Sequence, residues 1–200
     1  MTRPLVVVKI GGSLLADGRL PSVLCAIAAW RGMRLVLVPG GGVFADAVRI
    51  AQERAGFDDA LAHRLALDAM GRMAEVFTAL QPMLIMARDP VGIAAAHSCG
   101  RIPVWDPIEL RDGDPDIQES WNVTSDSLAL WLATLLGAEH LVLLKSAEPP
   151  ACLDLAFLAV QGLIDSAFPA FARNFDGAIH LLGPSADLTE LGSVQEPAAA

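Results

Sequence analysis

The feature that most constrains the fold lies near the start of the chain, where an apolar β-branched run ends in a lysine, two glycines and a serine: Val6-Val7-Val8-Lys9-Ile10-Gly11-Gly12-Ser13. Such a short apolar run is typical of a strand buried on both faces of a parallel sheet. Similar runs recur along the chain, separated by segments with helical periodicity, at residues 35–38, 83–86, 102–105, 141–144 and 179–182. The alternation predicts an α/β protein, a three-layer αβα sandwich with an open, mostly parallel sheet.

The segments between these runs complete the expected layout. Residues 14–18 and 111–119 are interpreted as loops, and residues 151–160 are apolar and ambiguous between helix and strand. The length suits one domain over residues 1–191, with a disordered tail at 192–200. Helices are expected at residues 20–30, from Gly42 to about 55, and at 60–80, 90–98, 128–136 and 164–171.

Lysine is unusually placed in this chain. Of the 14 basic residues only Lys9 and Lys145 are lysines, and both end apolar runs. Ligands of open α/β sheets bind outside the carboxyl ends of the strands, where both lysines are expected. The two glycines and Ser13 would add bare N–H groups and a hydroxyl for a phosphate. The alternative is an ordinary strand–turn with a solvated lysine.

Two further stretches are candidates for a binding site. Pro39-Gly40-Gly41-Gly42 joins a predicted strand to a predicted helix, so it could hold an anion at the positive end of the helix dipole, or simply form a tight turn. Residues 121–127 place five polar residues in seven before another helix, more than an N-cap alone requires. His63, by contrast, is expected in the core or at a dimer interface rather than as a ligand.

Composition narrows the classes of function. A net charge of −9 argues against a nucleic-acid partner or an anionic membrane surface. Three scattered cysteines and four histidines lack metal-ligand spacing, so no protein-held metal site is expected. No apolar run is long enough for a membrane span, and Lys9 interrupts the one that could resemble a signal peptide. A cytoplasmic protein is expected.

The catalytic possibilities are correspondingly few. No Ser–His–Asp arrangement, Rossmann fingerprint or Walker motif is present. The candidates that remain are lysines, glycine-rich anion sites and Asp126 at a helix start. Phosphoryl transfer needs little more, because it depends on positioning and charge stabilisation.

These stretches, in this order and spacing, resemble the amino acid kinase superfamily: residues 9–13, 39–42 and Asn122-Val123-Thr124-Ser125-Asp126. The resemblance covers roughly residues 5–147 and implies ATP with Mg²⁺ and a homodimer. It implies that Lys9 reaches the transferred phosphoryl group and that Asp126 orients Lys9. By the same resemblance Gly11, Gly12 and Ser13 cradle phosphate oxygens, and the acceptor is held by Gly40, Gly41 and Gly42, with Asn122 and Thr124.

The chain departs from that pattern in its C-terminal third. Members commonly carry a second catalytic lysine after a Gly-Gly-Met-type turn, but residues 162–169 contain none. Many members continue Thr-Asp-Val-Asp-Gly at a strand end where this chain has Lys145-Ser146-Ala147-Glu148-Pro149. Either Lys145 serves as the second catalytic and nucleotide-binding lysine, or the protein is a weak or non-catalytic nucleotide- or metabolite-binding relative.

Within the superfamily the sequence is similar to the [5-(aminomethyl)furan-3-yl]methyl phosphate kinases of methanofuran biosynthesis, on residues 39–46, 62–64, 105–107 and 121–126. This similarity implies a phosphate acceptor; another small phosphate or carboxylate acceptor is the alternative. Asp46 stands where isopentenyl phosphate kinases carry a phosphate-contacting histidine. Either Asp46 pairs with an ammonium group of the acceptor, or it only complements the helix dipole.

Overall fold

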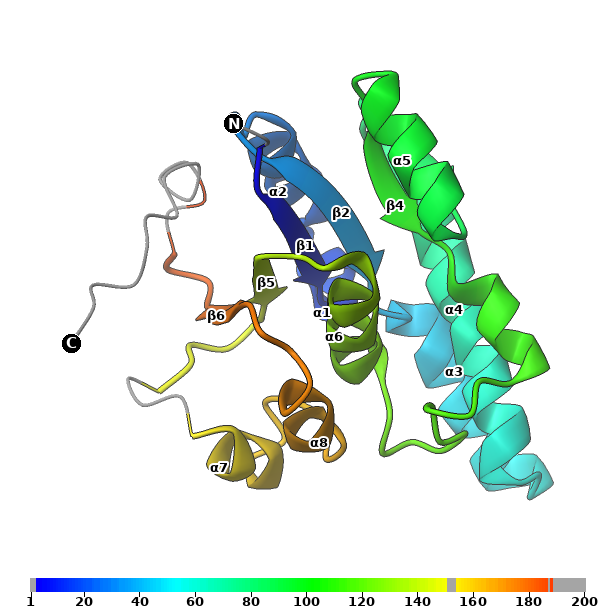
Figure 1. Cartoon of the computed structure of the whole chain (residues 1–200). Coiled ribbons are helices and arrows are strands. Elements are labelled where there is room, and N and C mark those ends of the chain that lie inside the picture. Colours follow the sequence, from blue (N-terminus) through cyan, green and yellow to red (C-terminus); the bar gives the residue numbers. More distant parts are fainter. Residues whose placement is uncertain (1–2, 151–153, 187, 189–200) are drawn as a thin grey trace.

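The computed structural model describes residues 3–150, 154–186 and 188, and its centre is a six-stranded, all-parallel sheet (Figure 1). The strand order is β3-β4-β2-β1-β5-β6, so β1, the strand that carries Lys9, lies between β2 and β5 and pairs with both. The α/β prediction is confirmed. The strands are β1 Leu5–Ile10, β2 Arg34–Pro39, β3 Leu84–Ala87, β4 Ile102–Trp105, β5 His140–Leu144 and β6 Ala178–Leu182.

Helices cover both faces of this sheet and so create two separate cores. On one face Val6, Val8 and Ile10 pack with α2, and on the other Leu5 and Val7 pack with α6. This division follows from the strand, whose successive side chains point to opposite faces. The helical elements are α1 Ser13–Ala16, α2 Leu20–Ala28, α3 Gly42–Ala55, α4 Asp59–Leu80, α5 Pro90–Ser98, the 3₁₀ helix η1 Pro107–Asp112, α6 Ser125–Leu136, α7 Leu155–Val160 and α8 Phe168–Ala172.

Several element boundaries differ from the sequence prediction. The expected loop after Ser13 begins with one turn of helix, and the expected loop after Arg111 begins inside η1. Helix α6 starts at Ser125, three residues early, which puts Asp126 in its first turn. Helix α8 starts only at Phe168, because Asp165 accepts a hydrogen bond from its N–H and Pro169 suits a first turn. The predicted tail at 192–200 lies outside the described residues.

The register of the central strands brings the two lysines together. Lys9 of β1 is paired with Leu143 of β5, so Lys145 lies two residues further along, just past the strand end. Lys9 follows Val7, and Lys145 follows Leu143, at the two-residue period of a strand; both therefore point to the face covered by α6. The sequence thus directs both ammonium groups toward the first turn of one helix.

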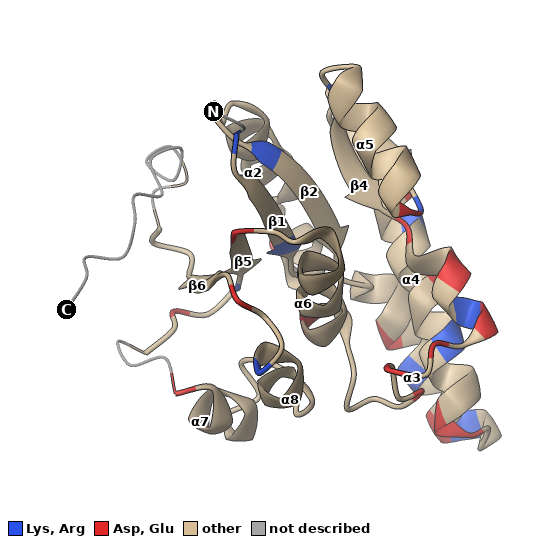
Figure 2. Ribbon diagram, viewed as in Figure 1, with Lys and Arg blue, Asp and Glu red and all other residues tan. Residues whose placement is uncertain are grey.

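Charged side chains are concentrated on α3, α4 and the segment after β4, and the sheet carries few of them (Figure 2). Lys9 is an exception, since it lies within a strand whose residues are all buried. Across the described ranges, no helix combines the length and the apolar character that spanning a bilayer requires.

Candidate active site

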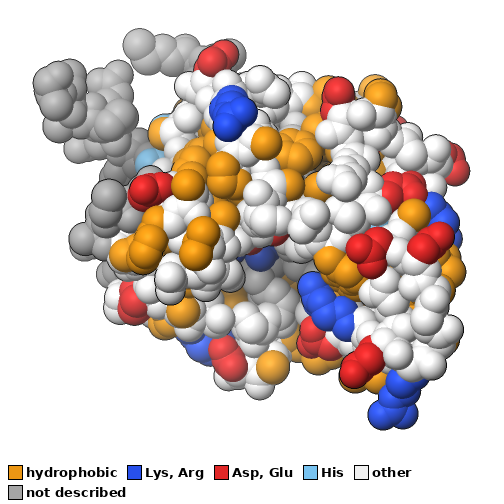
Figure 3. Space-filling view, turned by 90° about the horizontal axis from the view of Figure 1, so that it is seen from below, with side chains coloured by type: hydrophobic (Ala, Val, Ile, Leu, Met, Phe, Trp, Pro, Cys, Tyr) orange, Lys and Arg blue, Asp and Glu red, His pale blue; other side chains and the backbone are white. Residues whose placement is uncertain are grey.

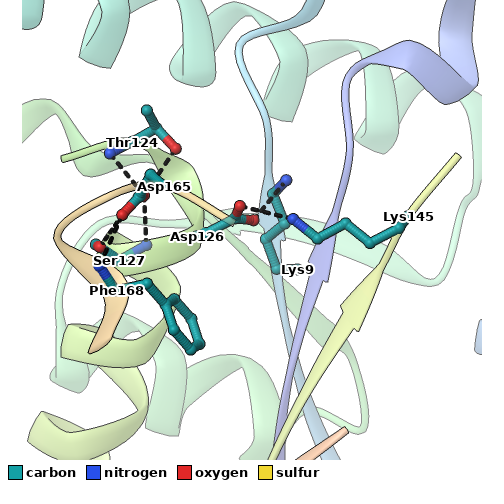
Figure 4. A network of polar contacts seen from close by, with 7 residues as sticks. All are labelled: Lys9, Thr124, Asp126, Ser127, Lys145, Asp165 and Phe168. Carbon is teal, nitrogen blue, oxygen red and sulfur yellow. Dashed lines mark hydrogen bonds and ion pairs between the residues drawn. The ribbon is translucent and has the colours of Figure 1, made fainter. Parts of the chain in front are cut away.

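A carboxylate held between two lysines forms the centre of the site (Figure 4). Lys145 Nζ donates a hydrogen bond to Asp126 Oδ2 at 2.6 Å, and Lys9 Nζ lies 2.8 Å from Asp126 Oδ1 as an ion pair. All three side chains are buried, with 7–11% of their surface exposed. The cluster carries a net charge of +1, so it still attracts an anion.

The charges of this cluster shift one another's proton affinity. Burial favours the neutral acid of Asp126, but the neighbouring Lys9 and Lys145 outweigh burial and lower the pKa of Asp126. Burial, together with repulsion from Lys9, lowers the pKa of Lys145 to about 8 despite its pairing with Asp126. Asp126 is therefore an ionised anchor for two lysines and a poor proton acceptor.

Two glycine loops meet beside this cluster. Gly40 N donates a hydrogen bond to the Ile10 carbonyl oxygen at 2.8 Å, and a Cβ on Gly12 would overlap the backbone of Gly42. Gly42 itself has φ +52, the left-handed region that favours glycine. The loop after β1 and the loop after β2 can lie this close only because both lack side chains. The N–H groups of Gly11 and Gly40 already donate to the carbonyl oxygens of Leu144 and Ile10, so the N–H groups of the remaining loop residues are the candidates for a bound anion.

Sequence reasoning missed Asp165, whose carboxylate holds the start of α6 (Figure 4). It accepts hydrogen bonds from the backbone N–H and hydroxyl of Thr124 at 2.9 and 2.8 Å, and from the N–H of Ser127 and Phe168 at 3.0 and 2.9 Å. The hydroxyl of Ser127 donates a fifth bond. The bond from Phe168 N to Asp165 is a local turn contact just before α8, whose N-cap is Ala167, and an aspartate in such a turn could have been recognised. The contacts of Asp165 to residues 124 and 127 could not have been recognised from the sequence.

Two clefts open on the carboxyl ends of the strands, where the surface is hollowed around a recessed basic side chain (Figure 3). One, of about 360 Å³, lies beside Gly40–Gly42 and helices α3 and α4. The other, of about 580 Å³, lies beside Lys145 and residues 162–166. Both are lined by five common residues: Lys9, Gly12, Ser13, Trp121 and Thr124. Lys9 thus stands where two bound molecules could meet.

The predicted site residues are distributed over these clefts. Gly40, Gly41, Gly42 and Asp46 line the smaller cleft, and Gly11, Asp126 and Lys145 line the larger. The structure does not bring Asn122 into either: its side-chain oxygen accepts a bond from Ser166, and its backbone carbonyl accepts one from Ala167. Thr124 lines both clefts, but Asp165 already accepts its hydroxyl proton, which leaves only its oxygen for a ligand.

Asp46 lies at the rim of the smaller cleft. Its side chain is 68% exposed, and Arg49 approaches it to 3.6 Å. The guanidinium of Arg49 also stacks over the ring of Trp121, 4.1 Å from the ring centroid. An ammonium pairing with Asp46 would be solvated and would compete with Arg49, so its contribution is limited to about 1 kcal/mol or less. The pairing itself stays a prediction.

The cluster suits nucleotide phosphates rather than a bare metal ion. No group of three or more histidine, cysteine, aspartate or glutamate side chains that could hold a metal occurs among the described residues. Two lysines and two glycine loops are the donors that phosphate oxygens need.

Comparisons with known proteins agree with this geometry. The chain is 30% identical over 181 residues to a protein named [5-(aminomethyl)furan-3-yl]methyl phosphate kinase from Methanocaldococcus jannaschii, which covers 84% of this chain and 83% of that protein. Uridylate kinase from Archaeoglobus fulgidus superposes with a TM-score of 0.69 at 15% identity, over 94% of this chain and 93% of that one. UMP kinase from Bacillus anthracis gives 0.67 at 15% identity, over 96% and 93%. At that identity the two structures support the fold alone.

The family model covers the part of the chain that builds the site. It matches residues 4–148, from β1 through Lys145, and so includes both glycine loops and Asp126. Residues 162–168, which carry Asp165, lie beyond it. With two lysines on one carboxylate and glycine loops on both sides, this phosphotransferase belongs to the amino acid kinase family.

Proposed function

We propose that the protein transfers the γ-phosphoryl group of ATP, bound with Mg²⁺, to the phosphate of [5-(aminomethyl)furan-3-yl]methyl phosphate. The observation that carries the proposal is Asp126, whose two carboxylate oxygens each face a lysine. A carboxylate held in this way cannot serve as a general base, so the acceptor oxygen must arrive already ionised. Phosphates, whose second pKa is about 6, meet that condition at neutral pH. Carboxylates meet it as well.

The two clefts support an assignment of the two substrates. The larger cleft, beside Lys145 and residues 162–166, suits the nucleotide, and the smaller one suits a compact acceptor. Lys9, common to both, would neutralise charge on the phosphoryl group while it moves between them. Asp126 keeps Lys9 and Lys145 in place before substrates bind, which avoids reorganisation during the reaction.

Lys145 would supply the second cation that residues 162–169 lack. Its ammonium contacts the other carboxylate oxygen of Asp126 than Lys9 does, and it comes from a strand end rather than from a Gly-Gly-Met-type turn. Asp165 belongs to the stretch of residues 162–169 that lacks a lysine, and its carboxylate fixes the start of α6. The contact of Lys145 with Asp126 supports a catalytic protein whose second lysine lies at the end of β5, rather than a kinase that lost turnover.

The identity of the acceptor rests on the similarity to the Methanocaldococcus jannaschii protein. The test is to incubate purified protein with ATP, Mg²⁺ and a panel of acceptors: aminomethylfuran methyl phosphate, isopentenyl phosphate, UMP and carboxylates. We expect ADP and a diphosphate product with the aminomethylfuran phosphate. Faster turnover of another acceptor would reassign the substrate. Tight ATP binding without acceptor-dependent ADP would instead favour a nucleotide-binding protein that lost turnover.

Assembly and location also belong to this proposal. We propose a homodimer working in the cytoplasm, where ATP is available. Helix α3 exposes Val43, Phe44 and Ile50, which are 48%, 39% and 53% accessible in the isolated chain. Apolar residues of this size on one helix are suited to contact a second copy. Light scattering on the purified protein would measure the mass directly.

A further inference from the structure

One face of α4 forms a wall of the smaller cleft. His63, Ala66, Leu67 and Met70 recur at spacings of three and four residues and line it together. Three of these side chains are apolar. His63 is the exception, and its side chain is buried, with 4% of the residue exposed. A buried polar group facing a cleft needs a partner, either in the protein or in the ligand.

The protonation of the His63 ring follows from its one hydrogen bond. Its Nδ1 lies 3.2 Å from the carbonyl oxygen of Ser120. A carbonyl oxygen can only accept, so Nδ1 must carry the proton. Burial lowers the pKa of His63, despite the opposing bond to Ser120, and keeps the ring neutral near pH 7. Nε2 therefore presents a bare lone pair, and no described residue donates a hydrogen bond to it.

The distance from His63 to the glycine loop matches a small ligand. A Cβ on Gly41 would lie 3.4 Å from the Cβ of Ala69, so this part of α4 is adjacent to the loop. His63 is six residues earlier, or roughly 9 Å along the helix axis. A small ring with a one-carbon arm on each side spans such a distance. A phosphate on the glycine loop would thus place the far end of the acceptor near His63.

We propose that Nε2 of His63 accepts a hydrogen bond from a donor group, an ammonium or a hydroxyl, at the end of the acceptor opposite its phosphate. This inference rests on the proposed function, in which the glycine loop of the smaller cleft binds the acceptor phosphate. His63 then discriminates among acceptors by the group that they carry at the end opposite the phosphate. An aminomethyl group supplies the donor, whereas a hydrocarbon tail would leave the lone pair buried and unpaired.

Binding titrations test the inference without requiring turnover. The two probes are [5-(aminomethyl)furan-3-yl]methyl phosphate and (5-methylfuran-3-yl)methyl phosphate, which lacks the amine. We expect the wild-type protein to bind the amine probe roughly 10- to 100-fold more tightly, as a hydrogen bond to a charged group gives. In His63→Asn the amide can still donate to the Ser120 carbonyl, but it is too short to replace Nε2, so the preference should vanish.

Two further variants separate recognition from structure. His63→Gln places an amide oxygen near the position of Nε2 and should keep most of the preference. His97→Asn is the matched control, because the ring of His97 also bonds to a carbonyl oxygen, that of Leu35, but on α5 and outside the cleft. The His97→Asn variant should prefer the amine probe over the methyl probe by the same factor as the wild-type protein. A preference that persists in His63→Asn would show that another group binds the amine and would overturn the inference.

Nuclear magnetic resonance on the wild-type protein, labelled with ¹⁵N-histidine, gives a readout that needs no variant. The Nε2 resonance of His63 should move from the lone-pair range toward the hydrogen-bonded range with the amine probe and stay in place with the methyl probe. An unmoved resonance at saturation, or no binding of either probe, would overturn the inference. A shifted resonance without any ADP formation would leave it standing and refute the proposed kinase activity instead.

Discussion

Lys9 and Lys145 approach opposite oxygens of one carboxylate, and their positions give them different tasks. Lys9 lines both clefts, whereas Lys145 lines only the larger one. A charge that must act on the phosphoryl group between two substrates therefore has to come from Lys9. Lys145 is placed to hold the phosphates of the donor nucleotide and to fix Asp126 from the other side.

Substitution of Lys9 tests its task. Lys9→Ala should lower kcat by about 100-fold or more with an unchanged fold, because the charge on the moving phosphoryl group is no longer neutralised. Lys9→Arg should fail as well, since a planar fork does not fit the space of an ammonium held against Asp126. Steady-state kinetics with circular dichroism as the folding control measures both. Near-normal turnover in either variant would contradict the assignment.

Lys145 should give the enzyme an alkaline limb in its pH profile. The pKa of its ammonium is about 8 in the free protein, so the charge that binds nucleotide phosphates is lost as pH rises through that value. The value of kcat/KM for ATP should fall above pH 8, and kcat should fall only at higher pH, because bound phosphate favours the protonated amine.

Two variants identify the group that titrates. Lys145→Arg should remove the limb, even at lower overall activity, because a guanidinium stays protonated throughout this range. Lys145→Met should lose activity at every pH. A limb that persists in Lys145→Arg would show that another group titrates.

At the scale of elements, Asp165 joins the C-terminal third of the chain to the N-terminus of α6. Four of its donors belong to Thr124 and Ser127, on either side of Asp126 in the turn that starts α6, and one is the first N–H of α8. This carboxylate is therefore a positioning group: it makes no hydrogen bond to Lys9 or Lys145, but it fixes the turn that carries Asp126. The C-terminal third of the chain thus supports the site through this contact, in addition to lining the larger cleft.

Replacement of Asp165 by asparagine keeps the shape and removes the charge. The amide NH₂ would then face at least two N–H or O–H donors, so Asp165→Asn should lower the free energy of unfolding by about 1–3 kcal/mol. It should also lower kcat more than KM for the acceptor, because Asp126 loses its alignment. Asp154→Asn, which alters the N-cap of α7, is the control and should cost only a few tenths of a kcal/mol.

Urea unfolding and steady-state kinetics measure both effects. Loss of stability in Asp165→Asn with kcat unchanged would make Asp165 a merely structural residue.

The sequence predicted those features that depend on the chain near each motif. Lys9, Gly40–Gly42 and Asp126 lie at one edge of the sheet, as the strand pattern predicts, because the carboxyl ends of parallel strands meet there whatever the loops do. Contacts between segments far apart in sequence were not predictable in the same way. Asp165 binds Ser127, 38 positions earlier, and His63 contacts Ser120, 57 positions later. Asn122 likewise accepts hydrogen bonds from residues 166–167.

At the scale of the whole molecule, two clefts converge on one buried cluster with a net positive charge. Each cleft uses a different part of the chain: the smaller is formed by the loop after β2 with α3 and α4, and the larger by the segments after β5 and α7. Under the proposed function, this arrangement would separate recognition of the acceptor from recognition of the nucleotide. In the proposed reaction the phosphoryl group would pass between the clefts beside Lys9, the one cation that lines both.

The most direct measurement of this claim is a crystal structure with a non-hydrolysable ATP analogue, Mg²⁺ and the aminomethylfuran phosphate bound together. The account predicts the nucleotide in the cleft beside Lys145 and residues 162–166, the acceptor phosphate on Gly40–Gly42, and the γ-phosphate within hydrogen-bonding distance of Lys9 Nζ. Both ligands in one cleft, or a γ-phosphate remote from Lys9, would contradict it.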